Sequence, residues 1–211
     1  MIQITWHGHS CFTVEAEDYT IVFDPYAPDS VPGLAPLNLT ADKVLCSHDH
    51  ADHGCTYVVE APVYSDCPFE IEEIPTFHDP EGGTLRGENM IHVLSCDGMR
   101  VAHFGDLGCE LTDEQKDLLR NLDVAMIPVG GHFTIDAGEA KALIDELRPR
   151  ITIPMHYRGE GFGYPVIAPL SDFTDLCDMV VEYDTDTIAI DKEGEEQVAV
   201  LSLSPEAVTG V

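Results

Sequence analysis

The sequence predicts an α/β protein with β-sheets in the middle and helices outside. The first half of the chain consists of short β-branched and aromatic runs, separated by glycine, proline and aspartate. The second half alternates such runs with helical segments that open on capping motifs. A chain of 211 residues is long enough to bury a core, and we expect a single domain over residues 1–211.

Six runs in the first half have the composition of β-strands. Gly8 and the pair Asp24-Pro25 bound the first three. One later run contains Pro62, which cannot donate a hydrogen bond within a sheet and therefore favours an edge position. The predicted strands cover residues 2–6, 11–16, 20–23, 57–64, 69–74 and 90–95.

Helix signals divide the second half. Thr112-x-x-Gln115 and Asp136-x-x-Glu139 are capping boxes, in which each side chain bonds the backbone of the other residue. They predict helices over 112–122 and 136–147, the second stopped by Pro149. The remaining predicted elements are strands over 100–104, 123–129 and 150–155, a short helix over 170–177 and a closing hairpin over 186–203.

The segment His48-Asp49-His50-Ala51-Asp52-His53 follows the apolar run 44–46, with only Ser47 between them. Imidazole nitrogens and carboxylate oxygens are ligands of zinc and similar divalent ions. His48 and His50 project from one side of an extended segment, while Asp52 and His53 lie past the bend and can face a second ion. The pattern predicts two metal ions, against the alternative of a His-rich surface loop that binds nothing.

Three further candidates each follow a predicted strand: His78, Asp106 and His156. Loops at one rim of a sandwich are where a scaffold places functional groups. Each of these residues alone could be a core residue. Together with the His48–His53 segment, they supply the ligands that a two-metal site requires.

In these residues the chain resembles the metallo-β-lactamase superfamily of metal-dependent hydrolases, and the segment 47–53 matches the signature of that superfamily without a gap. The resemblance implies an αββα sandwich of two mixed sheets flanked by helices. It assigns three histidines to one ion, two histidines and Asp52 to the other, and a bridging role to Asp106. The implied ligands are His48, His50 and His78 at the first ion, Asp52, His53 and His156 at the second, and Asp106 between them.

The opening Trp6-His7-Gly8-His9-Ser10 is similar to the branch that includes ascorbate-6-phosphate lactonase. The resemblance implies that His9 forms hydrogen bonds beneath the site and is not a ligand. Asp24 matches an aspartate that fastens the metal loop through hydrogen bonds, although turn chemistry before Pro25 is an alternative. His7 departs from the apolar residue expected at its position and is given no role.

Candidates for substrate contact are weaker. His132 follows two glycines that allow close backbone approach, and it could donate a hydrogen bond to an oxyanion. Arg86 and Arg158 are rare cations beside predicted ligand loops, and either could pair with a phosphate or carboxylate. The alternative is that both arginines merely neutralise nearby acids.

Composition limits the partners. With 39 acidic and 10 basic residues, the net charge is −29, which disfavours nucleic acid. No apolar run is long enough to span a membrane, and the seven cysteines lack a C-x-x-C pair, as expected for reduced thiols in the cytoplasm. We expect a small-molecule substrate, possible homo-oligomers, and a site whose local charge can attract an anion despite the acidic surface.

The resulting hypothesis is a hydrolase, lactonase-like, that cleaves an ester, lactone or phosphoester bond with a hydroxide held between two ions. Zinc is the first candidate, and manganese and iron are alternatives. Asp52 would orient the nucleophile. Two rival hypotheses stay open: a di-iron redox protein on the same fold, although such proteins use an acidic residue in place of His50, and a metal-retaining module without catalysis.

Overall fold

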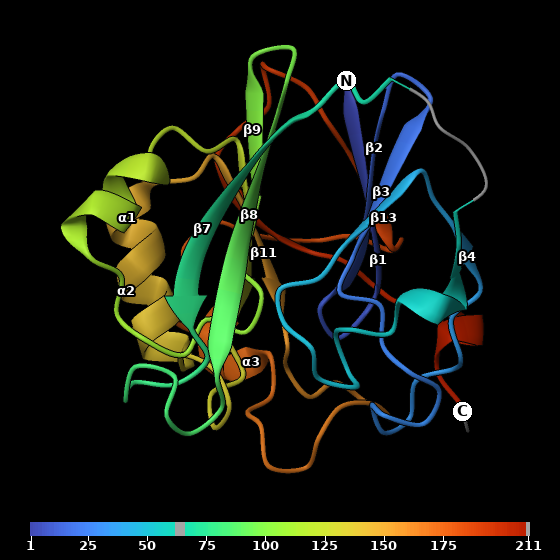
Figure 1. Cartoon of the computed structure of the whole chain (residues 1–211). Helices are drawn as coiled ribbons and strands as arrows, with labels where there is room; N and C mark the ends of the chain where they lie inside the picture. The colour runs from blue at the N-terminus through green and yellow to red at the C-terminus, as the bar shows by residue number, and fades with distance from the viewer. Residues whose placement is uncertain (62–65, 210–211) are drawn as a thin grey trace.

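The structure is a computed structural model that describes residues 1–61 and 66–209. Within these residues two β-sheets lie face to face, and helices cover the outer side of one sheet (Figure 1). This is the layered α/β arrangement that the sequence predicts. No helix in the described ranges is long and apolar enough to cross a lipid bilayer.

The first sheet has five strands, most of them from the N-terminal part of the chain. They are β1 (Ile2–Gly8), β2 (Cys11–Ala16), β3 (Tyr19–Phe23), β5 (Lys43–Leu45) and β13 (Thr187–Ile190). Their spatial order is β13-β1-β2-β3-β5. Strands β1 to β3 form an antiparallel meander, and β5 pairs in parallel with β3, so the sheet is mixed.

The second sheet has seven strands. They are β7 (Glu70–Phe77), β8 (Glu88–Cys96), β9 (Met99–His103), β10 (Val124–Pro128), β11 (Ile151–Met155), β12 (Val180–Glu182) and β14 (Gln197–Val200). The spatial order is β12-β14-β11-β10-β9-β8-β7. The pairs formed by β8 with β7 and β9 are antiparallel, and the pairs from β9 to β12 are parallel.

Successive side chains of β2 and β3 belong to two different hydrophobic clusters. Phe12 and Phe23 belong to the large core between the sheets, whereas their neighbours Cys11 and Val22 belong to a smaller cluster. Successive side chains of a strand point to opposite faces, so the smaller cluster covers the outer face of the five-stranded sheet. The covering segment contains β4 (Leu39–Thr40), β6 (Val59–Glu60) and the 3₁₀ helix η1 (Thr56–Val58), and a second 3₁₀ helix, η2 (Pro205–Ala207), lies near the C-terminus.

Helices α1 (Asp113–Leu118) and α2 (Ala137–Leu147) lie on the outer face of the seven-stranded sheet (Figure 1). Both predicted capping boxes are present, and both helices begin where predicted. The first helix ends at Leu118 and not at 122, and Leu119 and Leu122 beyond it are buried outside the helix. The short helix α3 covers only Ser171–Thr174 of the predicted 170–177.

Two predicted elements are wrong. The expected hairpin over 186–203 does not form, because β13 pairs with β1 in one sheet and β14 pairs with β11 and β12 in the other. The expected strand over 57–64 is replaced by η1 and the two-residue β6, which pairs with β4 alone in a separate sheet. Residues 62–64 of that prediction lie outside the described residues.

The strand directions explain why functional residues meet. Strands β1, β3 and β5 run one way in their sheet, and β7, β9, β10 and β11 run one way in theirs. The carboxyl ends of each set therefore share an edge. At that edge the His156 amide, after β11, donates to the carbonyl of His9, after β1, at 3.3 Å.

Candidate metal centre

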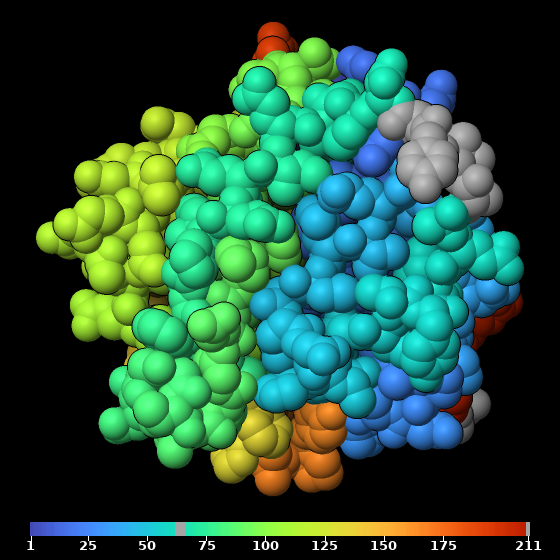
Figure 2. All heavy atoms as spheres, in the orientation of Figure 1, coloured from blue at the N-terminus to red at the C-terminus, as the bar shows by residue number. Residues whose placement is uncertain are grey.

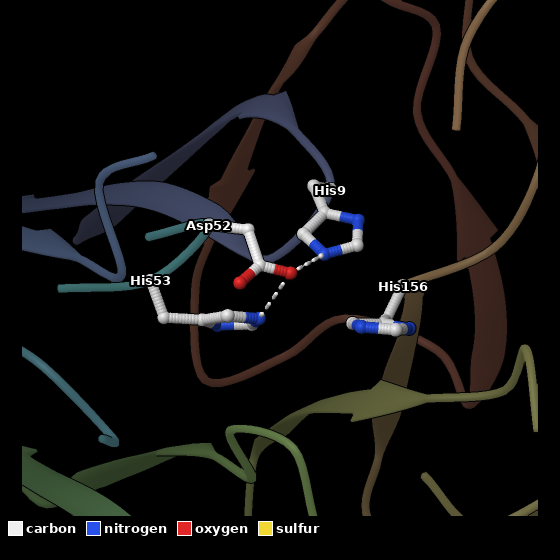
Figure 3. Close-up of side chains that lie close together, drawn as sticks. All are labelled: His9, Asp52, His53 and His156. Carbon is white, nitrogen blue, oxygen red and sulfur yellow. Dashed lines mark hydrogen bonds and ion pairs between the residues drawn. The ribbon is translucent and has the colours of Figure 1, made fainter. Parts of the chain in front are cut away.

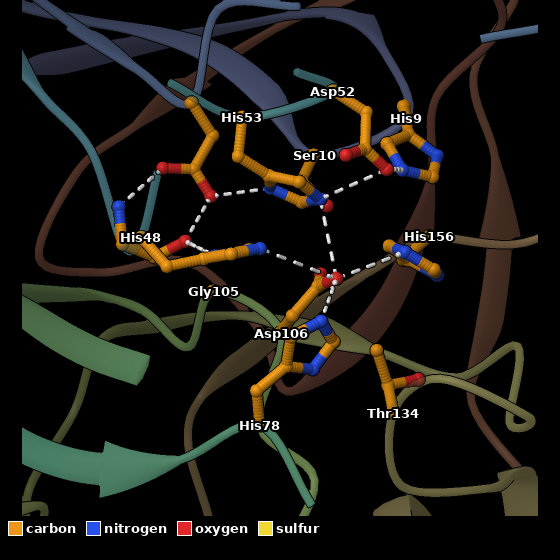
Figure 4. Close-up of polar contacts among 12 residues, drawn as sticks. His9, Ser10, His48, Asp52, His53, His78, Gly105, Asp106, Thr134 and His156 are labelled. Atoms are coloured by element: carbon orange, nitrogen blue, oxygen red, sulfur yellow. Dashed lines mark hydrogen bonds and ion pairs between the residues drawn. The ribbon is translucent and has the colours of Figure 1, made fainter. Parts of the chain in front are cut away.

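The carboxylate of Asp106 lies at the centre of the predicted site (Figure 4). Its Oδ2 atom is 3.2 Å from Nε2 of His53 and 3.2 Å from Nε2 of His156. The Nε2 atoms of His78 and His48 are 3.4 Å and 4.0 Å from the same oxygen. One carboxylate oxygen thus faces four imidazoles that come from loops of both sheets.

The predicted ligands fall into two groups around Asp106. The first contains His48, His50 and His78, whose ligand atoms lie within 4.8 Å of one another. The second contains Asp52, His53 and His156, within the same limit and together with His9. The structure therefore brings all seven predicted ligand residues together. His50 is exposed, and His48 and Asp52 are half-buried, so the group opens to solvent on this side.

The donor set fits divalent ions. The Nε2 atoms of His48, His53 and His156, and Oδ1 of Asp106, are buried and have no hydrogen-bond partner among the described residues. A buried polar atom without a partner costs about 1–3 kcal/mol. Imidazole nitrogen and carboxylate oxygen are the atoms that zinc takes as ligands, and an ion among them would satisfy these atoms.

Asp24 bonds both ends of the segment 47–53, which we call the metal loop because it contains four of the predicted ligands. It is fully buried, and its carboxylate accepts hydrogen bonds from the Ser47 amide at 2.6 Å, the Ser47 hydroxyl at 2.6 Å and Nδ1 of His53 at 2.8 Å. Burial alone would raise the pKa of Asp24, but His103 and these donors lower it to about 2. With Nδ1 of His53 committed to Asp24, Nε2 is the nitrogen left for a metal.

The electrostatics of the site favour a cation. Burial lowers the pKa of His53, but the carboxylates of Asp106, Asp24 and Asp52 outweigh it and raise that pKa well above its ordinary value. A bound metal ion would compensate the same carboxylates and take the place of the proton on His53. His48 differs: burial, followed by the proximity of His53, lowers its pKa to about 3, which keeps it neutral and able to ligate.

Two supporting residues had no predicted role. Asn89 is buried in β8. Its side-chain oxygen accepts a hydrogen bond from the backbone amide of Asp106 at 2.8 Å, and its side-chain nitrogen donates one to the Phe104 carbonyl at 3.0 Å. The carboxylate of Asp79 accepts hydrogen bonds from four backbone amides of the loop after His78. The signal for Asp79 was its place between a ligand and Gly82-Gly83, but a buried Asn within a strand-like run gave no signal in the sequence.

Gly105 lets two of the loops approach each other. Its φ is +55°, and a Cβ atom there would overlap Asn89 and Ser47. Glycine therefore permits the turn that carries Asp106 to pack directly against the start of the metal loop.

Tyr164 is a further residue at the site that the sequence did not reveal. Its hydroxyl is 3.3 Å from Oδ2 of Asp52 and donates to the Ser30 carbonyl at 2.7 Å. Its ring contacts His9 and Phe133 edge-on, with centroids 5.6 Å and 5.8 Å away. Nothing in the surrounding sequence marks this tyrosine, since only the folded loop brings it to Asp52.

The three predicted substrate residues lie outside the buried histidine group. His132 is exposed, and its carbonyl, not its imidazole, accepts a hydrogen bond from Nη2 of Arg86 at 3.0 Å. The Arg86 guanidinium also lies 5.8 Å from the centroid of the Phe133 ring. Arg86 and the 130–134 loop are thereby joined beside His78, whose amide donates to the Gly87 carbonyl. A role for His132 in chemistry stays a prediction.

Arg158 has different surroundings. Its Nε donates to the Ile167 carbonyl at 3.3 Å, and it lines a cavity of about 800 Å³ together with Trp6, Tyr157 and Phe162. The lining of this cavity includes none of the predicted ligands. The structure thus separates the two arginines that the sequence treats alike: no contact tests the predicted substrate role of Arg158, and its surroundings give that role no support.

Comparisons with known proteins agree with this geometry. A metal-dependent hydrolase of the UPF0173 group from Thermoplasma acidophilum is 30% identical over 189 residues, covering 74% of this chain and 83% of that protein. A solved structure from Thermotoga maritima, assigned to the zinc-dependent hydrolases of the metallo-beta-lactamase superfamily, aligns with a TM-score of 0.78 and 34% identity. It covers 97% of this chain and 100% of that chain.

The fold alone is shared more widely. A diiron β-hydroxylase from Streptomyces venezuelae aligns with a TM-score of 0.51 and 12% identity, over 73% of this chain and 44% of that chain. The family assignment rests instead on the sequence, because residues 3–156 match the model of the beta-lactamase superfamily domain. With this match and the histidine–aspartate centre, the chain belongs to the metallo-beta-lactamase superfamily of metal-dependent hydrolases.

Proposed function

We propose that the protein uses two divalent ions, zinc before manganese or iron, to hydrolyse an ester, lactone or phosphoester bond in a small molecule. The observation that carries this proposal is the position of the Asp106 carboxylate between two groups of imidazoles. Two-metal hydrolases hold their ions about 3.5–4 Å apart, and a carboxylate between two ligand groups suits that spacing. The names of the relatives support metal dependence and hydrolysis, and the number of ions is our proposal.

In the proposed hydrolysis, the ligand residues hold the ions and Asp52 orients the nucleophile. Two bound ions would supply a hydroxide nucleophile near neutral pH and polarise the bond that it attacks. Asp52 is half-buried, and its Oδ2 atom lies 3.3 Å from the Tyr164 hydroxyl, so Asp52 is placed to accept a hydrogen bond from the nucleophile and orient it.

Arg86 supports an anionic substrate. The described surface has few cations, and Arg86 is half-buried in the loop that follows His78. One of its terminal nitrogens bonds the His132 carbonyl, which steadies the guanidinium and leaves its other donors for a ligand. A carboxylate or phosphate on the substrate would match these donors. We propose a small anionic substrate and, given the net charge of −29, no nucleic acid.

A cytoplasmic location is also part of the proposal. All seven cysteines are free thiols, which is typical of proteins in a reducing compartment.

The test begins with purified protein as isolated. Metal analysis gives the identity and number of ions. Chelated and reconstituted samples are then compared on a lactone, an aryl ester and a phosphodiester. We expect metal-dependent hydrolysis of at least one substrate with two ions bound. Oxygen consumption without hydrolysis would favour the di-iron redox alternative, and metal binding without turnover of any substrate would favour the non-catalytic module.

Asp52→Asn isolates the proposed chemistry. An amide orients a nucleophile poorly and is a weak ligand, so turnover should be lost while the ion held by His48, His50 and His78 is retained. Asp49→Asn is the matched control, because Asp49 is exposed in the same segment and belongs to neither ligand group. Equal loss of turnover in both variants would contradict the role of Asp52.

A further inference from the structure

His9 occupies a strained and fully enclosed position. It follows β1 with a φ of +52°, a conformation that costs a non-glycine residue about 1–3 kcal/mol. The side chain is buried, and Nδ1 has no hydrogen-bond partner among the described residues. Its carbonyl accepts from Nε1 of Trp6 at 3.0 Å and from the His156 amide at 3.3 Å, so the backbone is held against the loop of a predicted ligand. Nε2 is the one polar atom of the ring that faces other functional groups.

Distances around Asp52 differ from those of the hydrogen bonds nearby. Oδ2 of Asp52 lies 3.3 Å from Nε2 of His9 and 3.6 Å from Nε2 of His53. A hydrogen bond between a charged donor and a carboxylate is shorter, about 2.7–2.9 Å, and the Asp24–His53 contact of 2.8 Å is of that kind.

The longer separations match those between atoms that share an ion. Two ligand atoms that are each about 2.1 Å from one ion, and about 90–120° apart, are separated by roughly 3.0–3.6 Å. The contacts of Asp106 with His53 and His156, both at 3.2 Å, fall in this range. The His9–Asp52 contact, at 3.3 Å, falls in it too.

The two ligand groups also resemble each other in the spacing of their imidazole rings. At the first group, the ring centroids of His48, His50 and His78 are 4.5, 4.7 and 5.3 Å apart. At the second, those of His9, His53 and His156 are 4.0, 5.2 and 5.8 Å apart. Figure 3 shows the three rings and the Asp52 carboxylate converging on one space. Without His9 the second group would have only two imidazoles.

We propose that His9 is a third imidazole ligand of the second ion, and not a residue that only supports the site through hydrogen bonds. This inference rests on the two-ion centre of the proposed function. Ligation through Nε2 would replace its long hydrogen bond of 3.3 Å to Asp52 and offset the strain of the turn. It gives the second ion His9, His53, His156 and Asp52, in addition to the shared Asp106.

Cobalt titration of the full-length apo-protein tests the assignment. Binding of Co²⁺ is followed by metal analysis, by competition with a chelator and by the visible absorption of the ion, none of which depends on turnover. His9→Gln is the discriminating variant, because its amide nitrogen can still donate a hydrogen bond to Asp52 but is a poor ligand. His7→Gln is the matched control on the same strand, since His7 contacts Thr13 and not the site.

We expect His9→Gln to bind the first equivalent of Co²⁺ normally and to bind the second more than about 100-fold more weakly, a larger loss than the removal of an outer hydrogen bond causes. The visible spectrum of the second ion should change, because one nitrogen ligand is missing. His7→Gln should behave like the wild type. A second equivalent bound by His9→Gln with wild-type affinity and spectrum would overturn the inference, as would equal losses in both variants.

His9→Gly guards against misfolding, because glycine adopts a φ of +52° without strain. Added imidazole should restore the second equivalent in this variant, and an affinity that is unaffected by imidazole would count against ligation. The two proposals fail differently. Wild-type protein that binds a single ion would refute the two-ion centre, whereas two ions in the wild type and in His9→Gln would refute only the role of His9.

Discussion

Asp24 shows how a single residue outside the ligand set controls the site. It holds both ends of the metal loop, through Ser47 at the start and His53 at the end. Its carboxylate is fully buried, but His103, His53 and Ser47 hold its pKa at about 2, so it is ionised at neutral pH. A permanent buried anion behind His53 makes that imidazole a stronger ligand.

Asp24→Asn should therefore weaken metal binding by about 10- to 100-fold, because asparagine is uncharged and has one accepting oxygen in place of the two that receive three hydrogen bonds from Ser47 and His53. Competition with a chelator at pH 7.5 measures the affinity. Asp29→Asn is the control, since Asp29 is an exposed loop residue. Wild-type affinity in Asp24→Asn would show that the hydrogen bond to His53 contributes nothing to binding.

We expect different effects on substrate binding when each of the two candidate arginines is replaced by alanine. Arg86→Ala should raise KM for anionic substrates by the equivalent of about 1.5–3 kcal/mol, the range for hydrogen bonds to charged groups. Neutral substrates should be little affected. Arg158→Ala should leave both substrate classes unchanged, because Arg158 lines a cavity without predicted ligands. Equal effects on charged and neutral substrates in Arg86→Ala would indicate a disturbed loop and not a lost contact.

At the scale of elements, β8 links the site to the core. Near its start, Asn89 holds the Asp106 loop, and three residues later His92 is buried in the core beside Phe23. Burial, followed by the proximity of His103, lowers the pKa of His92 to about 4. This strand therefore contains both a residue that serves the site and one that makes stability depend on pH.

The sign of that dependence follows from the two states. An unfolded histidine titrates near pH 6.5, and folded His92 near pH 4, so the unfolded chain takes up the proton first as the pH falls. The contribution of His92 to stability is full above pH 6.5 and is lost between pH 6.5 and pH 4, by up to about 3 kcal/mol at about 1.4 kcal/mol per pH unit.

Urea unfolding of the apo-protein from pH 7 to pH 4.5 checks this expectation. His92→Gln removes the titrating group, so its free energy of unfolding should fall less steeply with acid than that of the wild type. The other histidines titrate in both proteins and cancel in the comparison. Identical slopes would mean that His92 does not contribute.

At the scale of the whole molecule, the candidate metal centre lies where loops of the two sheets meet. The ligands follow β5 in one sheet and β7, β9 and β11 in the other, and the lower half of Figure 2 shows the light-blue and cyan segments bordering the green segment after β7. An ion held by both groups would therefore crosslink the sandwich at one edge. The hydrophobic core between the sheets contains none of the predicted ligands.

Removing the metal should lower the melting temperature without unfolding the protein. An ion present at 100 times its Kd stabilises the native state by about 2.7 kcal/mol. For a chain of this size, that corresponds to roughly 5–10 °C per ion. Scanning calorimetry before and after chelation measures the shift, and adding the metal back should reverse it. A chelated protein that is unfolded at room temperature would show that the ions are structural, as in a zinc finger.

Interactions between residues close together in the sequence were sufficient to predict the helix starts and many of the candidate ligands. The two capping boxes set the starts of α1 and α2, because a cap involves residues only three apart. The segment 48–53 and the ligands after three strands were readable for a similar reason: chain direction within a sheet places strand ends at a common edge. The metallo-beta-lactamase resemblance then supplied the sandwich, which the fold confirms.

Other features depended on contacts between residues far apart in the chain. Strands β13 and β14 look like a hairpin locally, but each finds a better partner in a different sheet, β1 for one and β11 and β12 for the other. The same holds for Tyr164 beside Asp52 and for His9 beside His156, which are separated by more than a hundred residues. Arg86 and Arg158 are equivalent in sequence context, and only the packing of their loops gives them different surroundings, because tertiary burial and not local propensity decides what a side chain touches.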